Sequence, residues 1–153
     1  MGTIVADAKD IKAGATLYMY KVSKSGEMIM VKANTCKVSD KGNVSVKLPE
    51  SGTYELVTSK EAKVLDKQIL NSIKPKKEQA SIKKGKSTEM KFADKFNEEN
   101  AKKIVYSVSN AAIAKISKYG KITAKKAGTV QVTATITLIN GKKKTVRMTV
   151  KVK

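Results

Sequence analysis

The sequence predicts an all-β protein built from two small antiparallel modules. Apolar and polar residues alternate with a period of two in its C-terminal part, a pattern typical of strands with one buried face. A Ser-x-x-Gly turn string occurs three times between apolar residues, and such turns commonly join neighbouring strands. No apolar stretch approaches the roughly 20 residues of a membrane helix, so we expect no transmembrane segment. The 153 residues suffice for one medium domain or two small ones.

Two C-terminal strands are the clearest elements. Every even position from Val130 to Leu138 is apolar, and the apolar residues of 145–153 are again the even ones. Asn140-Gly141 lies between the two runs and favours a hairpin. A two-residue loop would put the two apolar faces on opposite sides of the sheet. We therefore expect a three-residue loop, 139–141, with Gly141 in the left-handed conformation.

The three Ser-x-x-Gly strings are predicted to be three-residue hairpin turns. Ser favours the first position of a type I turn, and Gly tolerates the left-handed residue that follows it. This geometry pairs Ile116 with Ile122, Val38 with Val44, and Val22 with Met28. Residues 37–57 and 115–134 share a longer strand, turn and strand pattern. It indicates either a duplicated β-unit or convergence on a meander, and both interpretations remain open.

The N-terminal module is predicted over residues 1–66. Strands are expected near 15–22, 27–33, 36–39, 43–48 and 53–58, with an edge strand at 3–6. Tyr18 and Tyr20 share one strand face and suit either core packing or a sugar-stacking platform. Residues 59–68 indicate a short linker or one helical turn, and the second module spans 67–153. Within it, residues 94–103 are expected to form a surface loop or short helix.

Several kinds of catalysis are excluded by composition. The chain has no histidine, so imidazole catalysis and His-ligated zinc are not available. Cys36, the single cysteine, is interpreted as a buried small hydrophobe rather than a reactive thiol. The oxygen-rich stretch 94–100 lacks the spacing of a calcium loop. We therefore expect no enzyme activity, no cofactor and no metal.

The positive charge is concentrated in the second module. Residues 1–66 carry 10 basic and 8 acidic residues, whereas residues 67–153 carry 22 and 5, which gives net charges of +2 and +17. Such asymmetry is typical of surfaces that attract polyanions. The candidate binding residues are the basic ones at predicted loops and strand ends: Lys125, Lys126, Lys142, Lys143, Lys144 and Arg147.

This charge has two further interpretations. Lysines also protect sheet edges against aggregation and keep a domain soluble. Only one of the 32 basic residues is arginine, and aromatic residues are few, so sequence-specific nucleic-acid binding is not expected. The alternatives are therefore a solubilising surface or a surface that binds anionic wall polymer, membrane or, without specificity, nucleic acid.

From about Ile69 onward the sequence resembles the bacterial immunoglobulin-like domain of group 2. The resemblance is carried by Gly85-Lys86-Ser87, Tyr106-Ser107-Val108-Ser109-Asn110, Ile113 to Ile116, Gly120 to Ala124, and Ala127-Gly128-Thr129 followed by the alternating strand. The family usually has tryptophan at the position of Tyr106. Residues 1–60 resemble small β-modules of Gram-positive surface proteins, through Ile11 to Gly14 and Gly52 to Val57.

The resemblance implies an Ig-like β-sandwich used as a structural or adhesion module of a secreted or cell-surface protein. The expected partners are a host or cell-wall glycan, an anionic polymer or a protein; the oligomeric state is not predicted. Met1-Gly2-Thr3 shows no signal-peptide pattern, so an exported chain would be a fragment that lacks its signal peptide. A polyanion-binding module is the alternative function.

Overall fold

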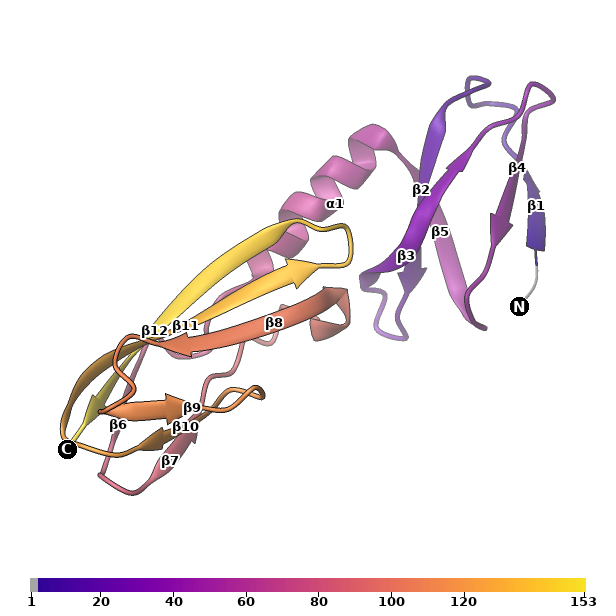
Figure 1. The fold of residues 1–153 in the computed structure, drawn as a ribbon. Helices are drawn as coiled ribbons and strands as arrows, with labels where there is room; N and C mark the ends of the chain where they lie inside the picture. Colours follow the sequence, from indigo (N-terminus) through magenta and orange to yellow (C-terminus); the bar gives the residue numbers. More distant parts are fainter. Residues whose placement is uncertain (1–2) are drawn as a thin grey trace. The chain divides into compact units, whose positions relative to one another are not determined.

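The computed structural model describes residues 3–153, and strands predominate in it (Figure 1). This confirms the all-β fold class. The chain divides into two compact units, residues 1–68 and residues 69–153.

The N-terminal unit contains two small antiparallel sheets. Its strands are β1 (Thr3–Asp7), β2 (Thr16–Val22), β3 (Met28–Lys37), β4 (Asn43–Lys47) and β5 (Thr53–Thr58). One sheet has the order β3-β2-β5, and the other pairs β1 with β4. The two strands expected at 27–33 and 36–39 form the single strand β3, which pairs with β2 through a register shift between Tyr18 and Tyr20.

A compact apolar cluster holds this unit together. Ala8, Leu17, Val38 and Val44 form the buried cluster, and Cys36 packs against it while partly exposed. Burial raises the pKa of the Cys36 thiol, which keeps it protonated and favours the packing interpretation. The Tyr20 side chain is 1% exposed, so it belongs to the core and is no open sugar platform.

The expectation of a linker or single helical turn after β5 is wrong, because the structure has the 14-residue helix α1 (Ser59–Ser72) there. The backbone N–H of Thr58 donates to Oε2 of Glu61, and the N–H of Glu61 donates to Oγ1 of Thr58. This reciprocal pair is a capping box. Helix-forming residues such as Ala62 and Leu65 then allow the helix to continue.

The C-terminal unit contains two further sheets. Its strands are β6 (Gln79–Ile82), β7 (Ser87–Glu89), β8 (Ala101–Val108), β9 (Ala114–Ile116), β10 (Lys121–Ala124), β11 (Gly128–Leu138) and β12 (Lys143–Val152), with the 3-10 helix η1 (Glu98–Asn100) before β8. One sheet has the order β6-β12-β11-β8 and the other β7-β10-β9. The β6–β12 pair is parallel, and the other pairs are antiparallel.

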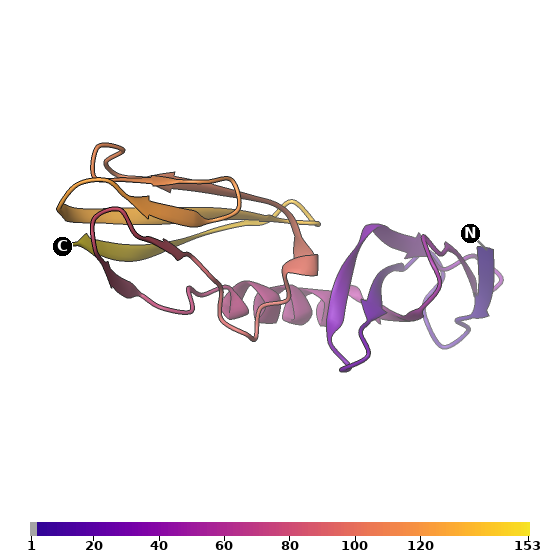
Figure 2. The same ribbon diagram turned by 90° about the horizontal axis from the view of Figure 1, so that it is seen from below.

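The core of this unit follows the predicted alternation. The even residues of β11 from Val130 to Leu138 are at most 1% exposed, and Val150 on β12 is 0% exposed. β11 and β12 run side by side along the unit in both ribbon views (Figures 1 and 2). The two apolar faces therefore lie on one side of the sheet, as parity required.

Two of the three predicted Ser-x-x-Gly pairings are confirmed. Ile116 is the partner of Ile122 in the β9–β10 pair, and Val22 is the partner of Met28 in the β2–β3 pair. The Ser39 turn also forms, since the N–H of Ser39 donates to the carbonyl of Asn43. However, β3 and β4 belong to different sheets and Val44 pairs with Ala6, so the expected strand pair of Val38 with Val44 is absent from the described ladders. The N–H of Leu138 donates to the carbonyl of Lys142, which leaves 139–141 as a three-residue loop. Gly141 has φ +88° in that loop, the left-handed value that the sequence predicts.

Candidate polyanion-binding site

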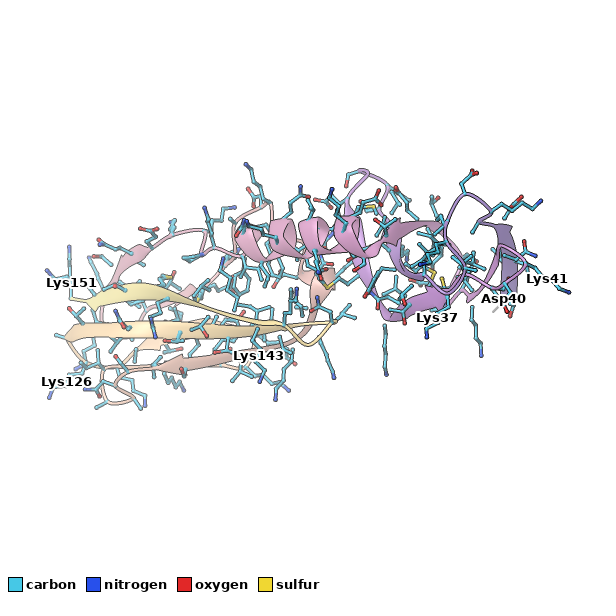
Figure 3. The ribbon with its side chains drawn as sticks, turned by 90° about the horizontal axis from the view of Figure 1, so that it is seen from above. Lys37, Asp40, Lys41, Lys126, Lys143 and Lys151 are labelled. Atoms are coloured by element: carbon cyan, nitrogen blue, oxygen red, sulfur yellow. The ribbon has the colours of Figure 1, made fainter. Side chains whose placement is uncertain are left out.

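The six predicted basic residues do not form one surface. Lys126 precedes Gly128, whose partner on β12 is Val152, whereas Lys143 is the partner of Thr137 near the other end of β11. Nine residues of extended strand separate these two ends, roughly 30 Å at 3.3 Å per residue. Figure 3 shows Lys126 and Lys143 well apart along the β11–β12 ribbon.

Two of these lysines bind backbone carbonyl groups. Lys144 is partly buried, and its Nζ donates to the carbonyl oxygen of Leu70 at 2.6 Å, in the last turn of α1. That turn contains no basic residue of its own, so Lys144 supplies the cation that a helix C-terminus favours. Lys125 Nζ donates to the carbonyl of Ala111 at 3.1 Å. Arg147 is exposed on the outer face of β12, opposite Thr133.

A different group of lysines lines a cavity of the C-terminal unit. The cavity has a volume of about 510 Å³, and its lining includes Lys76, Lys77, Lys91, Lys121, Ser87 and Met148. None of these four lysines was among the sequence-predicted site residues. They come from three separate segments of the chain, because only Lys76 and Lys77 are adjacent in sequence, and folding brings these segments together.

Backbone contacts position the cavity walls. Pro75 and Phe92 form an antiparallel bridge, and the N–H of Lys76 donates to the carbonyl of Lys91 at 2.7 Å. These contacts hold the segment before β6 against the segment after β7. Lys121 stands on β10 opposite Glu89 of β7, so the sheet fixes the remaining wall.

The four lysines differ in their ion pairs. Lys76 Nζ lies 3.2 Å from Oδ1 of Asp94, and Lys91 Nζ lies 3.4 Å from Oε2 of Glu89. Over residues 3–153, the structure gives Lys77 and Lys121 no carboxylate partner. The cavity therefore carries excess positive charge and suits a phosphate, sulfate or carboxylate group.

The oxygen-rich segment 94–100 is structural. Asn97 caps η1 by accepting a hydrogen bond from the N–H of Glu99, and Asn100 is 3% exposed. Across the described part of the chain, no three His, Cys, Asp or Glu side chains lie close enough together to hold a metal ion. No helix within residues 3–153 is both long and apolar enough to cross a membrane.

The comparisons with known proteins agree with the Ig-like fold that the sequence predicts for the C-terminal unit. A model of the bacterial Ig-like domain (group 2) matches residues 70–151, more than half of the 153-residue chain. No curated protein shows significant similarity to the chain. The likeness of the first 60 residues to Gram-positive surface modules lies outside the matched range and stays a prediction.

Proposed function

The chain belongs to the bacterial Ig-like domain (group 2) family, a family of structural and cell-surface modules, and on that premise we propose that it is a non-catalytic, tension-bearing module of a secreted or cell-surface protein. The parallel pairing of β6 with β12 carries the proposal. β6 is the first strand of the C-terminal unit and β12 is the last. Tension along the chain therefore acts on these two strands.

The hydrogen bonds between these strands would all be loaded together. The backbone N–H of Thr149 donates to the carbonyl of Glu78 at 2.8 Å, and the backbone N–H of Lys153 donates to the carbonyl of Ile82 at 2.9 Å. Because the strands are parallel, pulling on the chain before β6 and after β12 moves them in opposite directions along their axes. The bonds must then yield together in shear, which raises the barrier to forced unfolding.

Single-molecule force spectroscopy on a tandem polyprotein tests this proposal. The carbonyl groups of Glu78 and Ile82 point toward β12. Because backbone groups alternate in direction along a strand, the N–H of Ala80 also points toward β12, whereas the N–H of Ser81 points away from it. Ala80→Pro should lower the unfolding force clearly, whereas Ser81→Pro should stay close to the native value. Equal forces for Ala80→Pro and the native chain would contradict a β6–β12 clamp.

Polyanion binding is the second candidate function, supported by the cavity that Lys77 and Lys121 help to line. A chain that acts through these lysines should bind an immobilised phosphate polymer at low salt and release it steeply toward physiological salt. The double variant Lys77→Gln/Lys121→Gln should weaken binding. The control Lys83→Gln/Lys84→Gln changes the net charge equally at exposed residues outside the cavity. Equal losses in both variants would indicate a diffuse charge effect and no site.

A further inference from the structure

Tyr119 is the most exposed large hydrophobic side chain that the structure describes, at 79%. It lies at the tip of the β9–β10 hairpin, where Ser117 orders the backbone. The N–H groups of Tyr119 and Lys121 both donate to Oγ of Ser117, at 3.2 and 3.1 Å. The N–H of Gly120 donates to the carbonyl of Ser117. The ring is therefore presented to solvent by a well-bonded turn.

A second cavity, of about 300 Å³, lies beside this ring. Its lining includes Tyr106, Tyr119, Lys102, Lys103, Lys118 and Glu98. Three lysines and two tyrosines thus contribute to the lining of one space, with a single glutamate among them. Lys118 Nζ lies over the Tyr119 ring, 5.1 Å from its centroid.

Tyr106 gives the cavity a fixed hydroxyl group. Its ring packs beneath the hairpin, with Cζ 3.0 Å and the hydroxyl oxygen 3.2 Å from the Cβ position of Gly120. Desolvation, and to a lesser extent Glu98, raises the pKa of Tyr106, so the hydroxyl stays protonated at neutral pH. A protonated phenol both donates and accepts hydrogen bonds.

This combination points to one ligand class. An exposed aromatic ring offers an apolar face to the C–H face of a sugar ring, a fixed hydroxyl can bond a sugar hydroxyl, and the lysines match an anionic substituent. Binding of single-stranded nucleic acid normally uses several stacking rings in succession, whereas within residues 3–153 Tyr119 is the only strongly exposed aromatic side chain. We propose that the cavity beside Tyr119 binds an acidic sugar residue, a uronate or a sulfated sugar, of a glycan. The site lies outside the β6–β12 pair, so this inference stands apart from the tension-bearing function.

Calorimetric titration of the full chain with short oligogalacturonates tests the proposal. The native chain should bind the acidic oligosaccharide and should not bind its methyl-esterified form, which keeps the sugar ring and loses the charge. Tyr119→Ala should weaken binding by about tenfold, while Tyr119→Phe, which keeps the ring, should stay within about threefold. Lys102→Gln/Lys118→Gln should weaken binding and reduce its salt dependence.

The controls separate a sugar site from general electrostatics. Lys83→Gln/Lys84→Gln removes the same charge at exposed residues outside the cavity and should leave the affinity for oligogalacturonate unchanged. Inorganic polyphosphate and oligo(dT) are offered as charged polymers without an acidic sugar of this kind. The proposal is overturned if either polymer binds more tightly than oligogalacturonate, if Tyr119→Ala binds like the native chain, or if both lysine double variants lose affinity equally. A failure of any of these tests leaves the β6–β12 clamp untouched, because force resistance is measured without ligand.

Discussion

Cζ of Tyr106 lies 3.0 Å from the position that a Cβ atom would take on Gly120. The carbonyl oxygen of Met90 is 3.1 Å from the same position, and Gly120 has φ +86°. Two independent constraints therefore require glycine here: the left-handed backbone and the close approach of the tyrosine ring. This contact joins the turn that presents Tyr119 to the strand β8 that carries Tyr106.

Gly120→Ala should destabilise the C-terminal unit more than Gly141→Ala. Gly141 also has positive φ, +88°, but nothing lies within 4 Å of its Cβ position. The Gly141 variant should therefore cost only the left-handed penalty, roughly 1 kcal/mol. Gly120→Ala should cost about 1–3 kcal/mol more, because the added methyl group clashes with Tyr106 and Met90. Amide hydrogen exchange in β11 reports the local free energy of opening, and similar losses in the two variants would refute the close contact.

Much of the register could be predicted from residue parity, while the sites could not. Pairing Ile116 with Ile122 needed only the turn type and the requirement that both side chains be buried. The sequence also contains the signature of a capping box, because Thr58 and Glu61 are three positions apart and precede a helix-forming run. The prediction of a linker or single turn did not take this signature into account. The helix length was hard to anticipate, since Ala62 is its one buried residue and no strong apolar stripe marks it.

The two cavities depend on contacts between distant segments. Lys77 and Lys121 are 44 positions apart. Both line one cavity because β7 lies beside β10 and the Pro75–Phe92 bridge holds the segment before β6 against the segment after β7. A single sequence shows that lysines are abundant, and the local pattern places them in loops or at strand ends. The order of the strands in the sheets decides which lysines line the same cavity. That order depends on pairing between segments far apart in the sequence.

Tyr20→Phe should destabilise the N-terminal unit. The Tyr20 hydroxyl donates to Oδ1 of Asp66 on α1 at 2.9 Å, and the ring is 1% exposed. Losing a part-buried bond to a carboxylate should cost about 1–2 kcal/mol. The control is Tyr54→Phe, whose hydroxyl donates to the carbonyl of Glu50 at an exposed site. That change should cost about 0.5 kcal/mol or less. Urea unfolding followed by circular dichroism measures both, and a Tyr20 variant as stable as the Tyr54 variant would show that the buried bond contributes little.

The same tyrosine predicts a loss of stability at alkaline pH. Desolvation first, and then the hydrogen bond and charge of Asp66, raise the pKa of Tyr20 well above its ordinary value near 10. Above pH 10 the unfolded state therefore releases a proton that the folded state keeps. The contribution of Tyr20 to the free energy of unfolding should therefore be complete below about pH 10. It should decrease as the pH rises from there toward the pKa of Tyr20 in the folded state.

The slope from one such group is at most about 1.4 kcal/mol per pH unit. Lysines titrate in the same range, so the useful quantity is the difference in slope between the native chain and Tyr20→Phe between pH 9 and 11.5. The native chain should lose stability more steeply. Parallel curves would mean that Tyr20 ionises equally easily in both states.

Lys144→Met should weaken the end of α1. The Nζ of Lys144 donates to the carbonyl of Leu70 at 2.6 Å, whereas Lys143, the preceding residue, is exposed on the other face of β12. Methionine keeps most of the apolar stem and removes the ammonium group, so the loss isolates the bond to the helix C-terminus. We expect about 1 kcal/mol for Lys144→Met, and Lys143→Met should change stability by about 0.5 kcal/mol or less. Hydrogen exchange of the amides in the last turn of α1 localises the effect. If that turn exchanges at the same rate in both variants, Lys144 does not cap the helix and becomes an ordinary member of the basic surface.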